Sequence, residues 1–323
     1  MITFERRASV VLYKYLVSIK TEGIFLLPAN ICPIVPITFL KAGVMFEFVD
    51  ISINTLCINE KLIIEKVTRN PDKVSGVLFN HTYGTKYSPK GFFSRLKVLN
   101  PFLKIIDDRC LCLPLLKELP GELDGIDLIL YSTGYSKYTD IGFGGIGKLK
   151  DNVNGELTIG YNPQDLKELY ITYKQSLKNK SWYNYHDSNW LDCRNPSLDF
   201  DEYSKQVNSL IIKVGEQKSK INNIYSANIN HKIQYPSEFQ DWRFNIRVPG
   251  KDELLKRIFN DKLFASSLYE SLGDGVFSQS HFPVASKVNS ETINLFNDLY
   301  FDEEKAFSVC NIIDKHLRSY QNI

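Results

Sequence analysis

The sequence has little net charge, few clustered cysteines and no long apolar run, and each absence excludes a class of protein. Its 39 Lys and Arg against 37 Asp and Glu leave a formal net charge of +2, which argues against a dedicated nucleic-acid binder. Its six cysteines are dispersed over 323 residues and do not form the dense framework of a small secreted protein. No run approaches the roughly 18 apolar residues of a membrane helix, and no apolar signal core follows Arg6 and Arg7. We therefore expect a cytoplasmic protein that binds neither nucleic acid nor membrane.

The composition that remains is that of an ordinary globular protein. Hydrophobic residues make up 43% of the chain and aromatic residues 13%, which excludes an intrinsically disordered protein. The length suits one large α/β domain with a smaller partner. We predict a large domain over residues 1–225 and a small C-terminal domain over residues 226–323.

Short apolar runs alternate with helical patterns through the first half of the chain. The runs predict strands at 24–27, 46–50, 76–79, 103–106 and 128–131, and the patterns predict helices at 35–40, 60–67 and 92–99. Further along, helices are expected at 164–177, 200–224, 251–259 and 303–317, with a strand at 242–248. This order predicts an α/β fold, a mostly parallel sheet with helices on both faces, followed by a smaller α+β unit. Functional residues of such sheets gather at the carboxyl ends of the strands.

A lysine lies just beyond the fifth predicted strand, in the segment Tyr-Ser-Thr-Gly-Tyr-Ser-Lys-Tyr at 131–138. A glycine turn at 142–145 follows it and permits close approach of the backbone. In a partly desolvated pocket, Lys137 could form a Schiff base. The alternative is a surface lysine in a polar loop.

Two carboxylates end the fourth predicted strand. Asp107 and Asp108 follow Ile105 and Ile106 directly. An enzyme that uses pyridoxal 5′-phosphate (PLP) needs a carboxylate on the pyridine nitrogen, because the protonated ring is the stronger electron sink. A solvated aspartate at a strand end is the alternative.

Several segments, taken in chain order, resemble the DegT/DnrJ/EryC1/StrS sugar aminotransferases, which are PLP-dependent and have the aspartate-aminotransferase (type I) fold. The similarity extends over most of the chain. The segments are Glu-Arg-Arg-Ala-Ser-Val at 5–10, Pro-Ala-Asn-Ile-Cys-Pro at 28–33, Phe-Val-Asp at 48–50, Asn-His-Thr-Tyr-Gly at 80–84, Ile-Asp-Asp at 106–108, Ser-x-x-x-Ser-Lys at 132–137, and 282–285 with 293–295.

This resemblance implies a role for each matched residue. Lys137 is implied as the lysine that holds PLP as an imine and moves the proton, and Asp108 as the ring-nitrogen partner. The implied cofactor phosphate partners are Ser132, Arg7, Ala8 and Ser9, the last three at a helix N-terminus, and Cys32 takes the place of a ring that stacks on the cofactor. The implied substrate contacts are His81, Tyr83 and Tyr269. Arg243 could reach the substrate from the small domain, or it could have a core or interface role. A homodimer is also implied.

The resemblance implies an aminotransferase acting on a nucleotide-activated ketosugar, with glutamate as amino donor, in polysaccharide or secondary-metabolite biosynthesis. Four positions depart from the family pattern: Arg6 replaces a glycine, Cys32 an aromatic residue, Leu111 a Gln or His, and Phe143 an acid. These departures motivate a second hypothesis, a PLP-fold protein that binds cofactor or partner with little chemistry. A third hypothesis is another PLP reaction such as sugar dehydration, which the presence of Lys137 disfavours.

Three other patterns have rival interpretations. Residues 142–147 fit G-x-G-x-x-G, but the stretch 148–155 reads as turn-rich and not as the helix that a dinucleotide site requires. Cys110 and Cys112 with His81 could indicate a metal site or a thiol nucleophile. A lone C-x-C without a second pair is a weak zinc pattern, and ordinary buried cysteines are expected instead, so no metal site is predicted. The basic stretch of Lys86, Lys90, Arg95, Lys97 and Lys104 is either a solvated helix face or a surface that steers an anionic substrate.

Overall fold

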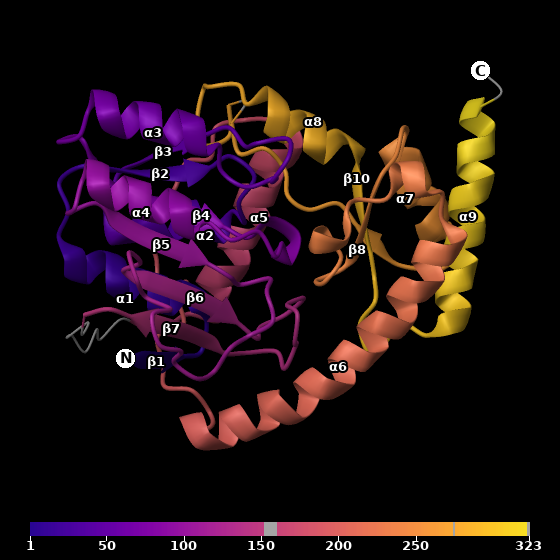
Figure 1. Cartoon of the computed structure of the whole chain (residues 1–323), viewed down its shortest axis with the longest axis horizontal. Helices are drawn as coiled ribbons and strands as arrows, with labels where there is room; N and C mark the ends of the chain where they lie inside the picture. Colours follow the sequence, from indigo (N-terminus) through magenta and orange to yellow (C-terminus); the bar gives the residue numbers. More distant parts are fainter. Residues whose placement is uncertain (152–159, 274, 322–323) are drawn as a thin grey trace.

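The computed structural model describes residues 1–151, 160–273 and 275–321 and contains two β-sheets (Figure 1). The larger sheet has seven strands in the order β1-β7-β6-β5-β4-β2-β3, and the smaller has three in the order β8-β10-β9. The strands are β1 (Ile2–Glu5), β2 (Ile24–Pro28), β3 (Phe46–Val49), β4 (Val74–Asn80), β5 (Lys104–Asp108), β6 (Leu128–Ser132), β7 (Gly145–Leu149), β8 (Phe244–Arg247), β9 (Ala265–Ser266) and β10 (Thr292–Leu295).

Helices connect most of these strands. They are α1 (Ala8–Ile19), α2 (Ile34–Ala42), α3 (Glu60–Arg69), α4 (Lys90–Leu99), α5 (Pro163–Asn179), α6 (Phe200–Asn228), α7 (Lys251–Asn260), α8 (Pro283–Glu291) and α9 (Glu303–Gln321), with short 3-10 turns at Thr82–Gly84, His231–Ile233 and Ser237–Phe239. None of the described helices has an apolar stretch long enough to cross a lipid bilayer.

The large sheet is mostly parallel, as predicted. Strands β6, β5, β4, β2 and β3 pair in parallel, while β7 runs antiparallel to both of its neighbours, β6 and β1. Parallel strands need crossover connections, and the helices between them supply these.

Apolar residues on the two faces of the sheet form two separate cores. Along β4, Leu78 packs with the helices α1 and α2, whereas its neighbours Val77 and Phe79 pack with α3 and α4. This alternation follows from the two-residue period of a strand. The prediction of helices on both faces is therefore confirmed.

The two antiparallel strands at one edge of the large sheet, β1 and β7, were not predicted. The stretch 148–155 reads as turn-rich from its sequence, and that interpretation is wrong for Lys148 and Leu149, which lie in β7. Lys148 is fully buried. Its ammonium group lies 2.7 Å from Oε2 of Glu122 and donates to the carbonyl of Lys117, and these contacts compensate the buried charge. Residues 152–155 of that stretch lie outside the described residues.

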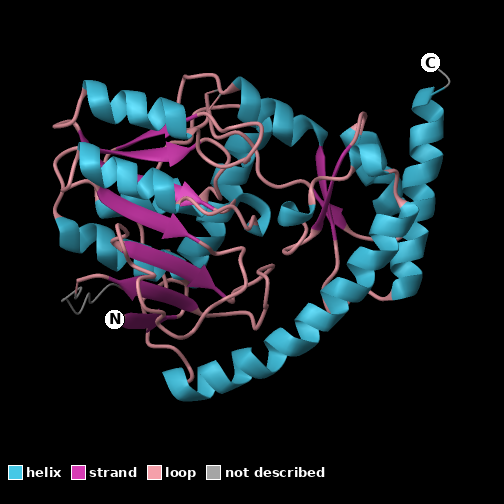
Figure 2. Cartoon of the chain, viewed as in Figure 1, coloured by secondary structure: helices cyan, strands magenta, loops and turns pink. Residues whose placement is uncertain are grey.

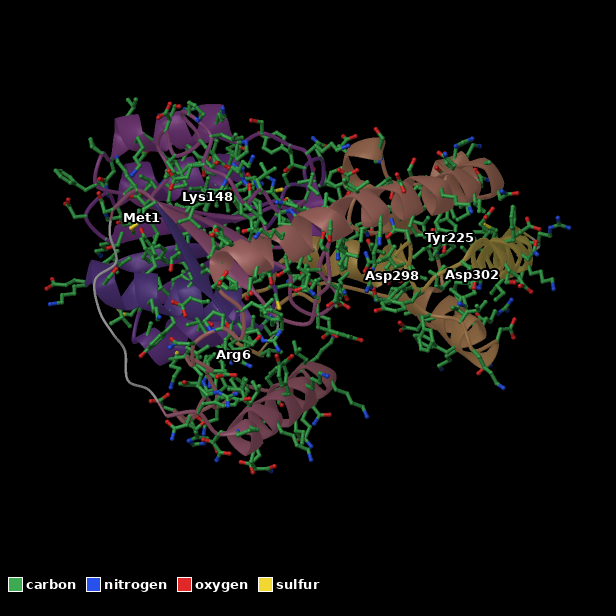
Figure 3. The ribbon with its side chains drawn as sticks, turned by 90° about the horizontal axis from the view of Figure 1, so that it is seen from below. Met1, Arg6, Lys148, Tyr225, Asp298 and Asp302 are labelled. Carbon is green, nitrogen blue, oxygen red and sulfur yellow. The ribbon has the colours of Figure 1, made fainter. Side chains whose placement is uncertain are left out.

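A smaller unit follows the large one. Its three-stranded sheet packs against α7, α9 and the second half of α6, where Ile221 and Tyr225 lie in its core. Figure 3 shows α6 running from the large unit, where Lys148 lies, to the small unit, where Tyr225 and Asp298 lie. The α+β architecture of this unit is as expected. The proposed division near residue 225 stays a prediction, because α6 crosses it without a break and α8 packs back onto the large core.

The carboxyl ends of the parallel strands face the small unit (Figure 2). The segments that follow β2, β4, β5 and β6 therefore converge at this edge.

Candidate active site

A cavity of about 380 Å³ lies at the carboxyl edge of the large sheet. It is lined by segments that follow β2, β4, β5 and β6, by the start of α1, and by the segment 161–192. The predicted site residues that line it are Arg7, Ala8, Ser9, Cys32, His81, Asp108, Ser132, Lys137 and Tyr269.

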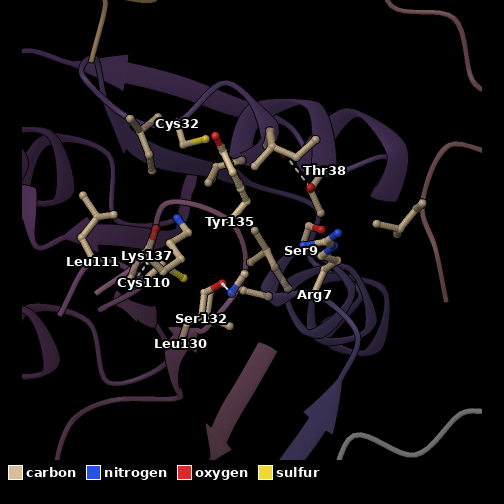
Figure 4. Close-up of a pocket in the computed structure, with 18 of the residues that line it drawn as sticks. Arg7, Ser9, Cys32, Thr38, Cys110, Leu111, Leu130, Ser132, Tyr135 and Lys137 are labelled. Atoms are coloured by element: carbon tan, nitrogen blue, oxygen red, sulfur yellow. Dashed lines mark hydrogen bonds between the residues drawn. The ribbon is translucent and has the colours of Figure 1, made fainter. Parts of the chain in front are cut away.

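Lys137 lies in the loop between β6 and β7. Its backbone N–H donates to the carbonyl of Gly134 at 3.3 Å, and Ile141 N–H donates to the carbonyl of Thr133 at 3.0 Å, so the loop closes on itself. Its side chain is half-buried and extends into the cavity between Cys110 and Tyr135 (Figure 4).

Asp108 ends β5 and faces the same cavity. Its carboxylate oxygen Oδ1 accepts a hydrogen bond from the backbone N–H of Cys110 at 2.9 Å. Its own carbonyl accepts from the N–H of His81 at 2.9 Å, which joins the ends of β4 and β5. The carboxylate is thus fixed by backbone groups.

The charges of Lys137 and Asp108 act on the same two thiols. Burial raises the pKa of Cys32, while Lys137 lowers it and Asp108 raises it. Burial also raises the pKa of Cys110, again with Asp108 raising it and Lys137 lowering it. The raised pKa keeps both cysteines as neutral thiols, and Lys137 and Asp108 line the same cavity as these thiols.

An anion-binding corner lies at the other end of the cavity. Helix α1 begins there without a side-chain cap and without an acidic residue in its first turn. The N–H groups of Ala8 and Ser9 and the helix dipole are therefore available to an anion, whereas Val10 N–H donates to the carbonyl of Arg7. Arg7 lies at this corner and donates from Nη1 to the carbonyl of Gly142 at 2.8 Å. The hydroxyl of Ser132 lies beside it and accepts from Gly134 N–H at 3.3 Å. Together these groups fit a phosphate.

Gly145 is required by this corner. A Cβ atom at this position would lie 2.1 Å from the backbone nitrogen of Ala8 and 2.2 Å from the carbonyl carbon of Arg7. Only a glycine lets β7 approach the start of α1 so closely.

The segment 161–192 forms a wall that the sequence did not predict. Tyr161, Tyr170, Tyr173 and Trp190 line the cavity together with Asp192. Arg6 and Arg194 flank Asp192, with guanidinium Nε atoms at 3.0 and 2.7 Å from its carboxylate oxygens, and hydrogen bonding to Arg194 contributes most to lowering the pKa of Asp192. The only sequence signal was an unusual density of Tyr and Trp with weak periodicity.

His81 lines the cavity, but its ring is engaged elsewhere. Its Nε2 lies 2.9 Å from Oδ1 of Asp107 and its Nδ1 lies 3.0 Å from the carbonyl oxygen of Thr85. Asp107 in turn accepts from Arg109. Among the described residues, no group of three His, Cys, Asp or Glu side chains is arranged to hold a metal ion.

Two predicted substrate residues do not line the cavity. Tyr83 is buried beneath it and stacks on Trp242, with ring centroids 6.4 Å apart. Arg243 is buried in the small unit and donates from Nη2 to the hydroxyl of Ser136 at 3.3 Å. Both therefore lie next to the cavity walls, behind the residues that face its interior.

The other sequence patterns resolve as structural features. The glycine-rich segment 142–147 leads into β7 and not into a helix, so the context of a dinucleotide-binding loop is missing. In the basic stretch, Lys97 and Lys104 both pair with Asp127, and Lys86 pairs with Asp241.

No protein-family model and no curated protein matches the sequence. Solved structures do match the whole chain. A DegT DnrJ EryC1 StrS aminotransferase from Brucella abortus has a TM-score of 0.65 at 14% identity, covering 98% of this chain and 85% of that one. The sugar aminotransferase CalS13 from Micromonospora echinospora has a TM-score of 0.64 at 13% identity, covering 97% and 87%.

A third match is the apo form of Spr1654 from Streptococcus pneumoniae, provisionally described as a sugar aminotransferase. Its TM-score is 0.70 at 14% identity, covering 99% of this chain and 88% of that one, and that protein has also been solved in PLP and PMP forms. At these identities the similarity establishes the architecture. The chain has the fold of the PLP-dependent aminotransferases, as the sequence resemblance predicted.

Proposed function

We propose that the protein is a PLP-dependent aminotransferase that acts on a nucleotide-activated ketosugar, with glutamate as amino donor. One observation carries the proposal. A lysine amine and a backbone-anchored carboxylate face the same region of one cavity, and an uncapped helix start with Arg7 and Ser132 forms its other end.

The residues of the cavity divide the binding of PLP among them. Lys137 is the candidate to bond the cofactor's carbonyl carbon. Asp108 is the candidate for its ring nitrogen, because Cys110 N–H holds the carboxylate in place. Arg7, Ser132 and the first N–H groups of α1 are candidates for its phosphate. PLP, when bound, supplies an electron-withdrawing ring that stabilises negative charge at the carbon next to the amine.

Residues of the chain would carry out proton transfer and would exclude water from the site. The amine of Lys137, which lines the cavity, would take the proton from the donor's α-carbon and deliver it again. The carboxylate of Asp108 would accept a hydrogen bond from the ring nitrogen of PLP. The apolar walls of Leu12, Ile31 and Leu130 reduce the access of water to the reacting atoms.

The wall of residues 161–192 supports a large, ring-containing substrate. Flat aromatic faces such as those of Tyr161 and Tyr170 stack on sugar rings and bases. Two of the matched proteins are described as sugar aminotransferases. A cytoplasmic homodimer in polysaccharide or secondary-metabolite biosynthesis is the setting that we propose.

A second candidate is a protein that binds PLP but transfers no amino group. Cys32 favours it, since a thiol lines the cavity where the resembled family has a stacking ring. The third candidate, sugar dehydration, is disfavoured because Lys137 extends into the cavity.

The visible spectrum of the purified protein mixed with PLP and then with glutamate separates these candidates. Transamination predicts a band of lysine-bound cofactor that glutamate converts to the pyridoxamine form. Lys137→Ala should abolish the band, and Lys90→Ala, at an exposed lysine of α4, should not. A band that glutamate leaves unchanged supports the second candidate, and a band that survives Lys137→Ala contradicts the assignment of the lysine.

A further inference from the structure

Ser136, the residue before Lys137, is held through all of its polar groups. Its N–H donates to Oδ2 of Asp140 at 2.7 Å. Its carbonyl accepts from the indole N–H of Trp242 at 2.9 Å, and its hydroxyl accepts from Arg243 at 3.3 Å. Two of the three partners thus come from the small unit, just before β8.

The backbone at Ser136 needs this support. Its φ is 60°, in the left-handed region that a residue with a side chain seldom occupies. Such a conformation persists where the surrounding structure imposes it. Because the next residue is Lys137, the conformation of Ser136 sets the direction in which the lysine side chain leaves the loop.

Trp242 is itself rigidly placed. It is 1% exposed, and its ring stacks on Tyr83 with an angle of 5° between the planes. Its carbonyl accepts from the ammonium group of Lys218 at 2.6 Å. The indole therefore has little freedom to move away from Ser136.

Arg243 is buried and forms no ion pair within 4 Å among the described residues, although Asp298 acts on it electrostatically. It instead donates to the hydroxyls of Ser136 and Ser266, and its guanidinium lies 3.7 Å from the ring centroid of Phe296. A buried charge with neutral partners is costly for stability. A role of Arg243 in the loop that carries Lys137 would explain why a charged residue lies here.

Lys218 holds the other side of the loop. From α6, its Nζ donates to Trp242 and to Oδ1 of Asn297 at 2.9 Å, and it lies 5.0 Å from the ring centroid of Tyr138. The residues before and after Lys137 are thus contacted by one cluster of buried side chains, and we name Lys218, Trp242 and Arg243 the clasp.

We propose that the clasp is a set of positioning residues, which transmits the position of the small unit to Lys137 and directs the lysine amine into the cavity. This inference rests on the proposed function, because it assigns a reason for that direction. Neither Trp242 nor Arg243 lines the cavity, so both act through Ser136.

Two conservative variants test the clasp. Trp242→Phe removes the indole N–H and keeps an aromatic ring on Tyr83, and Arg243→Lys keeps the charge but loses the two-pronged contact with Ser136 and Ser266. Arg247→Lys is the matched control, because Arg247 lies in the same segment but contacts Tyr235 and Glu291 instead.

The first measurement is amide hydrogen exchange of residues 134–142 in the protein without added cofactor. Loss of one hydrogen bond to Ser136 should accelerate exchange there about tenfold, with no change in the peptides of β2 to β5 and no change anywhere in the loop for Arg247→Lys. Exchange in both test variants equal to that of the wild type would overturn the clasp.

The second measurement is the rate at which PLP forms the lysine-bound band, and the pH at which that band changes. Both test variants should form the band about tenfold more slowly, and the pH midpoint of its change should shift. The part of the affinity for PLP that comes from contacts with its phosphate should be retained. A merely structural role predicts lower thermal stability with wild-type rate and midpoint. If the wild type forms no band, the proposed function fails, and hydrogen exchange still decides whether the clasp orders the loop.

Discussion

The neighbouring residues Asp107 and Asp108 of β5 have the same side chain but lie in opposite environments. Asp107 is fully buried on one side of the strand. Burial raises its pKa, but the interactions with His81 and Arg109 outweigh burial, so its pKa is lowered. Asp108 points the other way, into the cavity. The two-residue period of the strand enforces this division, but the sequence alone does not say which aspartate faces which side.

Replacing each aspartate by asparagine should therefore have opposite consequences. Asp107→Asn removes one partner of a buried charge network and should lower the free energy of unfolding by about 3–5 kcal/mol. Asp108→Asn should change it by less than about 1 kcal/mol, but slow the reaction of the PLP-bound protein with glutamate by about 100-fold or more. Urea unfolding and single-turnover spectra measure the two effects. An Asp108→Asn variant that reacts at the wild-type rate would contradict the assignment of this residue.

At the scale of elements, the parallel strands of the large sheet were predictable, and its antiparallel strands β1 and β7 were not. Strand β2 and the stretch 76–79 of β4 are largely apolar because both faces of these strands are buried. By contrast, β7 contains Gly145, Gly147 and Lys148, residue types that disfavour a strand. Their presence is explained by partners distant in sequence, namely the start of α1 for Gly145 and Glu122 for Lys148.

The junction of β7 with α1 should be sensitive to a single methyl group. Gly145→Ala forces the backbone of Arg7 and Ala8 to move, since its Cβ would lie 2.1 Å from Ala8 N. We expect a loss of about 2–4 kcal/mol in the free energy of unfolding and weaker binding of PLP. In the matched control Gly91→Ala, at a helical glycine of α4 with no atom within 4 Å of the added Cβ, we expect a gain of up to about 1 kcal/mol. Equal stability of the two variants would contradict this description of the junction.

At the scale of the whole molecule, the site is assembled from parts that local sequence patterns do not connect. It was predictable that Asp108, at the end of β5, and Lys137, in the loop after β6, would line one cavity, because parallel strands bring their carboxyl ends together. The wall of residues 161–192 and the clasp were not, because each depends on packing between segments far apart in the chain. Trp242 and Ser136, for example, are separated by 106 positions.

Lys218, which lies between the large and small units, should make stability depend on pH. Burial lowers the pKa of its ammonium group from 10.5 to about 7. Between these values the unfolded chain binds more protons than the folded one, so stability should rise as pH rises from about 7 to about 8.5, by at most about 1.4 kcal/mol per pH unit. In Lys218→Met this rise should be smaller.

The window ends there because burial raises the pKa of thiols such as Cys57, from 9.0 to about 12, and these favour unfolding at higher pH. Urea unfolding at several pH values, compared between the wild type and Lys218→Met, measures the difference. Identical pH profiles for the two proteins would show that Lys218 keeps its ordinary pKa in the folded state.

The central claim, that the amine of Lys137 bonds the cofactor, is tested most directly by chemical trapping. Wild-type protein is mixed with PLP, reduced with borohydride, digested, and mapped by mass spectrometry. Our account predicts one phosphopyridoxyl adduct, on Lys137, in stoichiometric yield. In Lys137→Ala, which leaves Asp108, Arg7 and Ser132 intact, this adduct should be lost. An adduct on another lysine of the wild-type protein, or scattered partial labelling of surface lysines with Lys137 unmodified, would contradict it.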